Sequence, residues 1–187
     1  MLPLPAQPLQ TTAWLNVPAP VTLESLRGQV VLLEAFQMLC PGCVSHALPQ
    51  ALRARHLFAE EDLAVIGLHT VFEHHDVQGT ARALEVFLHE YGIGFPVGID
   101  APSENGDLPR TMRAYGMQGT PTTILIDRRG NLRRHHYGHQ DDMRLGADIM
   151  ALLREDTLPD QSRTQPATEP GETPGLCTDQ GCLAERG

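Results

Sequence analysis

The chain has 187 residues, enough for one folded domain with an appendage, and 41% of them are hydrophobic, which suits an ordinary core. Its net charge is −9 and its pI is about 5.4, so we expect no nucleic-acid partner. Residues 1–16 lack the features of a signal peptide, and no stretch approaches the roughly 18 apolar residues of a membrane helix. These features predict a cytoplasmic protein with no membrane partner.

The first predicted elements are strand, helix and strand. The apolar run Val30–Phe36, broken only by Glu34, is typical of a strand buried on both faces of a parallel sheet. Residues 44–58 have helix formers at roughly helical spacing, and the interior Pro49 should kink this helix. Residues 63–68 predict a second buried strand.

The next part of the chain again alternates helices and strands. Residues 79–92 have amphipathic spacing, and the predicted apolar face consists of Ala83, Val86, Phe87 and Tyr91. The remaining predictions are a strand at 95–100, a helix at 108–116, a strand at 122–127, a strand at 132–137 after a turn, and a helix at about 141–154. This order predicts an α/β domain with a mixed sheet.

The composition changes after residue 154. Residues 155–175 are polar and rich in proline, which is typical of a linker or a flexible tail, and they lead to Cys177 and Cys182. We therefore divide the chain into a domain at 1–154 and a Pro-rich acidic tail at 155–187.

Cys40 and Cys43 flank Pro41 and Gly42 between the first predicted strand and its helix. A helix N-terminus has unpaired N–H groups and a positive dipole end, which stabilise a thiolate below the free-thiol pKa of ~8.5. Pro41 suits the first helical turn because its missing N–H is no loss there. The pattern predicts an exposed nucleophile at Cys40 and a buried resolving thiol at Cys43.

Two motifs, VVLLEAFQMLCPGC and YGMQGTPTTILIDRRGN, resemble the thioredoxin-like superfamily in this order. The sequence is most similar to the redoxin branch that contains the TlpA/ResA-like thiol–disulfide oxidoreductases, over about residues 21–153. The resemblance implies a thioredoxin-like fold, a mixed central sheet flanked by helices with an extra strand-helix insertion. The flexible C-terminal tail that the composition predicts follows this fold. The resemblance also implies an enzyme that reduces or exchanges protein disulfides.

The resemblance implies a proton-transfer role for Glu34, which stands where thioredoxins have the acidic residue that serves the resolving thiol. A carboxyl group in an apolar run has a raised pKa and can exchange protons near neutral pH. The alternative is a solvent-facing residue on an edge strand.

The resemblance also implies a substrate-binding set. Thr120 and Pro121 match a cis-proline motif that faces the dithiol and exposes backbone to an extended substrate. Pro41 and Gly42 complete the set and help to determine the redox potential. The alternative for Pro121 is an ordinary turn proline.

The sequence departs from the family at several positions. Leu39 replaces the usual aromatic residue before the first cysteine, and His46 stands where a glutamate is common. His46 is a candidate proton carrier because the pKa of histidine lies near physiological pH, although a surface position without a catalytic role is the alternative. The other histidines considered lack metal-site spacing, so we expect no metal and interpret them as solvated residues near the rim of the site: His69, His74, His75, His135, His136 and His139.

The function of the tail cysteines stays open. Cys177 and Cys182 could form a local disulfide, act as a second dithiol that passes electrons to the CPGC pair, or be incidental exposed thiols.

Three functions are compatible with these features. The first is a thiol–disulfide oxidoreductase without a cofactor, whose partners are a disulfide-containing protein and an electron donor resembling thioredoxin reductase or another dithiol protein. The second is a peroxiredoxin-like peroxidase, but Gln37 occupies the position where that site needs a hydroxyl. The third is a copper or zinc chaperone that uses the dithiol and a histidine.

Overall fold

The computed structural model describes residues 4–104 and 108–155. Their strands form one mixed sheet in the order β1-β7-β6-β3-β4-β5-β2. The strands are β1 (Leu4–Pro5), β2 (Thr11–Leu15), β3 (Val30–Phe36), β4 (Leu63–His69), β5 (Val97–Asp100), β6 (Thr122–Ile126) and β7 (Asn131–Tyr137). The helices are the π-helix η1 (Cys43–Ala47), α1 (Leu48–Leu57), α2 (His75–Gln78), α3 (Ala81–Glu90), α4 (Arg110–Ala114) and α5 (Asp142–Glu155).

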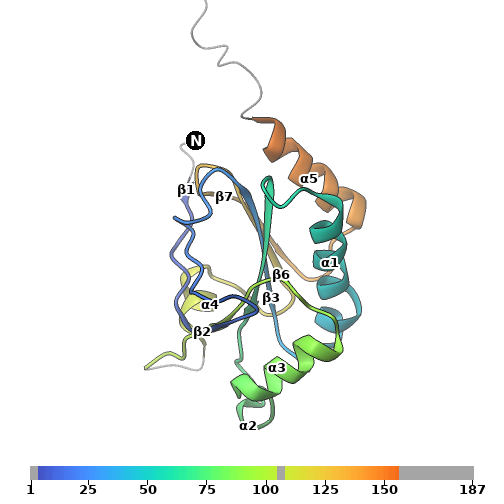
Figure 1. Cartoon of the computed structure of the whole chain (residues 1–187). Helices are drawn as coiled ribbons and strands as arrows, with labels where there is room; N and C mark the ends of the chain where they lie inside the picture. The colour runs from blue at the N-terminus through green and yellow to red at the C-terminus, as the bar shows by residue number, and fades with distance from the viewer. Residues whose placement is uncertain (1–3, 105–107, 156–187) are drawn as a thin grey trace, which may run out of the picture. The chain divides into compact units, whose positions relative to one another are not determined.

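The sheet is mixed because its central strand has one parallel and one antiparallel neighbour. β3 pairs in parallel with β4 and antiparallel with β6, and β4 pairs in parallel with β5. Helices α1, α3 and α5 lie on one face of the sheet, whereas α4 and the N-terminal segment lie on the other (Figure 1). This arrangement confirms the predicted thioredoxin-like fold.

All seven residues of β3 are buried, as the continuous apolar run predicts. Because strand side chains alternate between faces, β3 contributes to two cores. The even-numbered Val30, Leu32 and Phe36 join the core under α1, α3 and α5, which also contains Cys43. The odd-numbered residues join the core under α4 and the N-terminal segment: Val31, Leu33 and Ala35.

The predicted kink at Pro49 takes the form of a π-helix. Within η1 and into α1, the Leu48 N–H donates to the Cys43 carbonyl, five residues back instead of four. Pro49 follows directly in the first turn of α1, where its missing N–H and its ring disturb the regular ladder. The wider turn lets one continuous helical segment continue past the proline.

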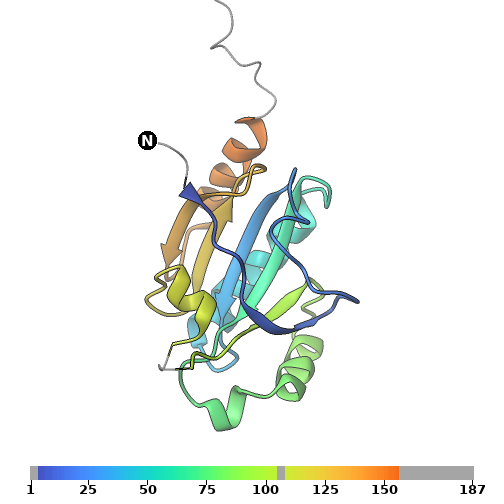
Figure 2. The ribbon, with the colours of Figure 1, turned by 90° about the vertical axis from the view of Figure 1, so that its left-hand side faces the viewer.

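Sequence patterns missed the two N-terminal strands. β1 and β2 occupy opposite edges of the sheet, paired with β7 and β5 respectively, and the chain between them crosses the α4 face (Figure 2). Edge strands tolerate proline and polar side chains, so the Pro-rich start gives no local strand signal. Their partners lie more than 80 residues away in the sequence, as the Leu4–Leu132 and Thr11–Asp100 pairs show.

The predicted buried face of α3 is wrong by a rotation about the helix axis. Leu84 and Leu88 are the buried residues of α3, whereas Val86 and Tyr91 are 46% and 52% exposed. Apolar residues cover a wide arc of this helix, and packing against the core under α1 selects the side with the two leucines. The sequence also did not predict the short helix α2.

No helix within residues 4–104 and 108–155 combines the length and apolar character needed to cross a membrane. The predicted tail, with Cys177 and Cys182, lies outside the described residues.

Asp100 connects three elements at the end of β5. Its Oδ2 accepts hydrogen bonds from Thr70 Oγ1 at 2.9 Å and from the Met112 N–H at 2.9 Å. Its Oδ1 accepts the Thr111 N–H at 2.8 Å. Since Thr70 and Thr111 are fully buried, each donor would lose its partner without access to water if this carboxylate were removed.

We expect Asp100→Ala to lower the free energy of unfolding by about 3 kcal/mol, because buried donors to a charged acceptor are left unsatisfied. Urea unfolding measures this loss. The control is Glu85→Ala, which removes the exposed ion pair with Arg82 and should cost less than about 1 kcal/mol. Equal losses in the two variants would show that Asp100 does not hold α4 in place.

Candidate redox-active site

A turn at residues 37–40 carries the chain from β3 into the helical segment. The Cys40 N–H donates to the Gln37 carbonyl at 3.3 Å, and the Val44 N–H donates to the Cys40 carbonyl at 3.1 Å. Pro41 and Gly42 are already helical, as predicted for the first turn. Cys40 therefore stands at the N-terminus of the helical segment, where backbone N–H groups are free to face a ligand.

Cys40 and Cys43 lie at disulfide distance, with Cα atoms 5.2 Å apart. Cys43 is completely buried, and Cys40 is partly exposed. The Cys43 N–H points at Cys40 Sγ over 3.2 Å. In the reduced protein this N–H is positioned to stabilise a thiolate at Cys40, which is the effect expected of a helix N-terminus.

The Thr120–Pro121 segment lies against the dithiol, and its peptide bond is cis. Cys40 Sγ lies 3.5 Å from the Thr120 carbonyl oxygen. A Cβ atom added to Gly42 would lie 3.4 Å from Pro121 Cδ, so Gly42 is close to the same segment. The structure thus brings together three of the four predicted substrate-binding residues, Thr120, Pro121 and Gly42, and Pro41 is exposed at the surface. Their role in binding stays a prediction.

Glu34 is buried in the centre of the sheet and is not on an edge strand. Its Oε2 accepts a 2.8 Å hydrogen bond from Thr123 Oγ1, and its Oε1 has no hydrogen-bond partner among the described residues. Burial raises the pKa of Glu34 to about 8, although the Thr123 bond acts in the opposite direction. Strand alternation places this carboxyl on the same face of β3 as the core that contains Cys43.

The histidines occupy two kinds of position. His46 is exposed on η1, and its ring lies 4.7 Å from that of His139, so its role as a proton carrier stays a prediction. His69 corrects our expectation of solvated histidines, because it is only 2% exposed at the end of β4, beside the Phe36 ring. Burial lowers its pKa to about 4. Among the described side chains, no group of three His, Cys, Asp or Glu residues is arranged to hold a metal.

Sequence reasoning missed Thr123 and Gln78. Thr123 lies opposite Glu34 in the β3–β6 register, and only that pairing makes it a partner of the carboxyl. Gln78, on α2, accepts the Leu39 N–H at 3.2 Å and so contacts the turn before Cys40. Thr123 lies within the second motif, but the motif assigns it no role of its own, and Gln78 belongs to neither motif.

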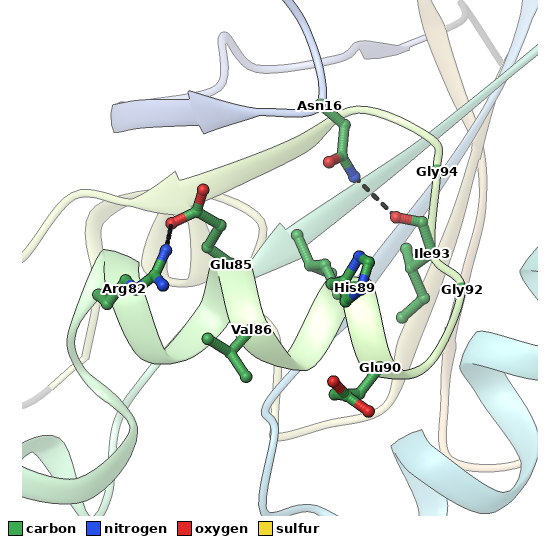
Figure 3. A pocket seen from close by; sticks show the side chains of 10 residues that line it. Asn16, Arg82, Glu85, Val86, His89, Glu90, Gly92, Ile93 and Gly94 are labelled. Atoms are coloured by element: carbon green, nitrogen blue, oxygen red, sulfur yellow. Dashed lines mark hydrogen bonds and ion pairs between the residues drawn. The ribbon is translucent and has the colours of Figure 1, made fainter.

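A hollow of about 670 Å³ lies along α3, away from the dithiol (Figure 3). Its lining is occupied by local contacts: Arg82 pairs with Glu85 at 2.7 Å, and Asn16 Nδ2 donates to the Ile93 carbonyl at 2.8 Å. None of the predicted site residues lines it. The candidate site is therefore the open surface around Cys40, and this hollow does not belong to it.

The buried carboxyl predicts a specific pH dependence of stability. In the oxidised protein, folded Glu34 keeps its proton up to about pH 8, whereas the unfolded residue ionises near 4.5. The folded state therefore binds more protons in this window, and the Glu34 contribution destabilises the fold increasingly as the pH rises. Glu34→Gln should consequently gain stability relative to the wild type from pH 4.5 to 8, by on the order of 5 kcal/mol.

Urea unfolding of both proteins at several pH values measures this difference. Buried His69 contributes a pH dependence of stability with the opposite sign, but both proteins contain it, so it cancels in the comparison. Glu85→Gln, a substitution at the surface, is the matched control and should show no comparable slope. A stability difference between Glu34→Gln and wild type that stays constant with pH would contradict the raised pKa.

Comparisons with known proteins agree with this geometry. Residues 5–149 match the Redoxin family. DipZ of Mycobacterium tuberculosis is 30% identical over 168 residues, which cover 87% of this chain and 23% of DipZ. The thiol-disulfide oxidoreductase ResA of Halalkalibacterium halodurans is 26% identical over 72% of this chain and 68% of its own length. The crystal structure of a thiol-disulfide isomerase from Corynebacterium glutamicum is 48% identical, with a TM-score of 0.77, over 81% of this chain and 97% of that one.

The match to DipZ spans less than a quarter of that relative, so it extends only to this domain. The Redoxin match, by contrast, covers most of the chain, including β3, the dithiol and the Thr120–Pro121 segment. With its thioredoxin-like fold and its Cys40–Cys43 pair, the chain belongs to the Redoxin family, in the thioredoxin-like branch that includes the thiol–disulfide oxidoreductases.

Proposed function

We propose that this protein is a thiol–disulfide oxidoreductase that reduces or exchanges the disulfides of protein substrates through Cys40 and Cys43. One observation carries the proposal. The two cysteines lie at disulfide distance at the start of a helical segment, with Cys40 accessible to a partner and Cys43 buried behind it. This is the arrangement that a two-step exchange requires.

In the first step, the Cys40 thiolate attacks one sulfur of a substrate disulfide. The substrate S–S bond breaks, a mixed disulfide forms at Cys40, and the second substrate sulfur leaves as a thiolate. In the second step, the Cys43 thiolate attacks Cys40 Sγ, and the bond between Cys40 and the substrate breaks. The protein then holds a Cys40–Cys43 disulfide, and two electrons have passed to the substrate. The reverse sequence oxidises a dithiol substrate.

Glu34 supplies a proton acceptor for the second step. Its pKa of about 8 lies close enough to neutral pH for the carboxyl to exist in both forms during turnover. Its Oε1 has no hydrogen-bond partner among the described residues, so one oxygen is available to a proton or a water molecule. We propose that the ionised carboxyl accepts the proton of Cys43, and that the neutral form returns it in the reverse reaction.

The proposed partners follow from this cycle. A disulfide-containing protein docks at Cys40 beside Thr120, Pro121 and Gly42, and a second dithiol protein restores the reduced state. Between them, the two thiols carry both electrons, so the cycle needs no further cofactor. The cytoplasmic location and the prevailing direction of exchange stay predictions from the sequence.

No specific observation favours either alternative function. A peroxidase of the peroxiredoxin type needs a hydroxyl at position 37, but Gln37 is buried and its amide is hydrogen-bonded to Gln78. A metal chaperone would need ligands beyond the two cysteines, and the pair His46 and His139 contact each other through their rings.

We expect Cys40→Ser to abolish disulfide reduction, because it removes the attacking sulfur. Cys43→Ser should instead accumulate mixed disulfides, because Cys40 can still attack but no thiol resolves the intermediate. Insulin reduction with a chemical thiol as electron donor measures turnover. Mass spectrometry under non-reducing conditions detects the mixed disulfide.

Both variants should be made in the wild-type chain and in a Cys177→Ser/Cys182→Ser background, so that the tail thiols cannot replace Cys43. A Cys43→Ser protein with full turnover in that background would contradict the two-thiol cycle. Peroxide consumption by the same protein would then favour the peroxidase.

A further inference from the structure

A hydrogen-bonded group of three side chains, two of them buried, lies beside the turn that leads into Cys40. We call Gln37, Glu73 and Gln78 the amide clamp. Gln37 and Gln78 are each only 1% exposed. Gln78 Nε2 donates to Gln37 Oε1 at 2.9 Å and to the Glu73 carbonyl oxygen at 2.9 Å. Gln37 Nε2 donates to Glu73 Oε1 at 3.3 Å. The clamp joins the end of β3 to the segment that contains α2.

The clamp also holds two backbone N–H groups. The Phe72 N–H donates to Gln37 Oε1 at 3.3 Å, and the Leu39 N–H donates to Gln78 Oε1 at 3.2 Å. Because a backbone N–H can only donate, these contacts determine which atom of each side-chain amide is oxygen. Gln78 thus uses both its donor group and its acceptor, and a side chain without an amide cannot replace it.

The bond to Leu39 acts on the turn that places the nucleophile. Leu39 is one residue before Cys40, and its own side chain is 54% exposed, so side-chain packing does little to hold this peptide. Within the turn, the Cys40 N–H contacts the Gln37 carbonyl at 3.3 Å, while the Gln37 side chain belongs to the clamp. The clamp therefore supports the turn from outside at both of its ends.

The segment that contains α2 has a backbone conformation that allows Gln78 to reach Gln37 and the Leu39 N–H. His74 has a left-handed backbone conformation, with φ of 51°, which is unfavourable for a residue with a Cβ. This conformation reverses the chain, so that Gln78, at the end of α2, returns to the Glu73 carbonyl. The segment is also attached to β3 through the Thr70 N–H, which donates to the Phe36 carbonyl at 3.1 Å.

We propose that Gln78 is a positioning residue for disulfide exchange, which holds the Cys40 turn through Gln37 and the Leu39 N–H. The proposal rests on the function proposed above and extends control of Cys40 reactivity to the segment between β4 and α3. Gln78 does not contact the sulfur atoms. It acts by keeping Cys40 Sγ where the Cys43 N–H, at 3.2 Å, can stabilise the thiolate.

Loss of the clamp should make the Cys40 thiolate less favourable. A freed turn no longer holds Sγ in line with the Cys43 N–H, and a weaker hydrogen bond stabilises the anion less. We expect the pH midpoint of Cys40 alkylation to rise by about half a pH unit in Gln78→Met. Below both midpoints this corresponds to ~3-fold slower alkylation, because the thiolate is the reactive form.

The test measures iodoacetamide alkylation of the fully reduced protein across pH, in the Cys177→Ser/Cys182→Ser background. Cys43 is buried, so the fast phase reports on Cys40. Gln78→Met keeps the length of the side chain and removes its hydrogen bonds. A folded Gln78→Met protein with the wild-type midpoint would overturn the proposal.

Gln50→Met is the matched control. Gln50 is also buried, and its Nε2 donates to the Gln140 carbonyl at 2.8 Å and to Asp142 Oδ1 at 2.6 Å, with no bond to the Cys40 turn. Like Gln78→Met, it should lower the melting temperature, but it should leave the alkylation midpoint unchanged. An equal shift in both variants would overturn the proposal, because general destabilisation would then explain the effect.

Two further measurements decide the matter if Gln78→Met does not fold. Gln78→Asn keeps the amide but is one methylene shorter, so it should give a smaller shift in the same direction. In the wild type, NMR hydrogen exchange should show a protected Leu39 N–H despite its surface loop. An unshifted Gln78→Asn, or an unprotected Leu39 N–H, contradicts the clamp.

Insulin reduction by the wild type separates this inference from the function on which it rests. If the wild type does not reduce insulin disulfides but Gln78→Met still shifts the alkylation midpoint relative to the wild type, the proposed function is overturned and the clamp is left standing.

Discussion

The burial of β3 on both faces is the constraint from which the site follows. β3 lies between β4 and β6 in the centre of the sheet, with a helical layer on one face and α4 with the N-terminal segment on the other. A strand held this tightly gives its last residue a well-defined position. The turn after Phe36 therefore places Cys40 just beyond the C-terminal end of this central strand, and Cys43 enters the core under α1. Because the strand is tightly packed on both faces, the positions of the two cysteines are well defined.

The same burial makes Glu34 an exception within the strand. Its neighbours stabilise the fold by leaving water, whereas its carboxyl loses hydration and recovers a single side-chain hydrogen bond from Thr123. The raised pKa expresses this cost as a preference for the neutral form. A carboxyl that destabilises the protein near neutral pH is compatible with a role in proton transfer, since functional groups often reduce stability where they act.

Three separate parts of the chain meet at the turn that carries Cys40. The helical segment supplies the Cys43 N–H, the loop before β6 supplies the Thr120 carbonyl, and the segment after β4 supplies the Gln78 side chain. All three contacts lie at the end of the sheet where the C-terminus of β3 is found. Parallel pairing of β3 with β4 brings the segment after β4 to this end, and antiparallel pairing with β6 brings the start of β6 there. The sheet topology, more than any local motif, assembles the site.

Local patterns were sufficient for the elements that form the core. The apolar run of β3, the helix after the dithiol and the cysteine spacing are properties of neighbouring residues, and so the strand, the helix and the pair at disulfide distance could all be predicted. The two sequence motifs were specific enough to indicate the fold. A helix N-terminus next to a cysteine pair has the same chemistry wherever it occurs.

Tertiary structure alone decided the features that depend on distant partners. The edge strands β1 and β2 exist through pairing with β7 and β5 and not through their own composition. The buried side of α3, the burial of His69 and the contact of Thr123 with Glu34 each depend on which surfaces meet when the layers pack. By itself, the sequence determined the chemistry of the dithiol and the order of the elements, because these arise from residues close together in the chain. Register and packing determined what surrounds the dithiol, because a hydrogen bond such as that of Gln78 to Leu39 joins residues that only the folded sheet brings together.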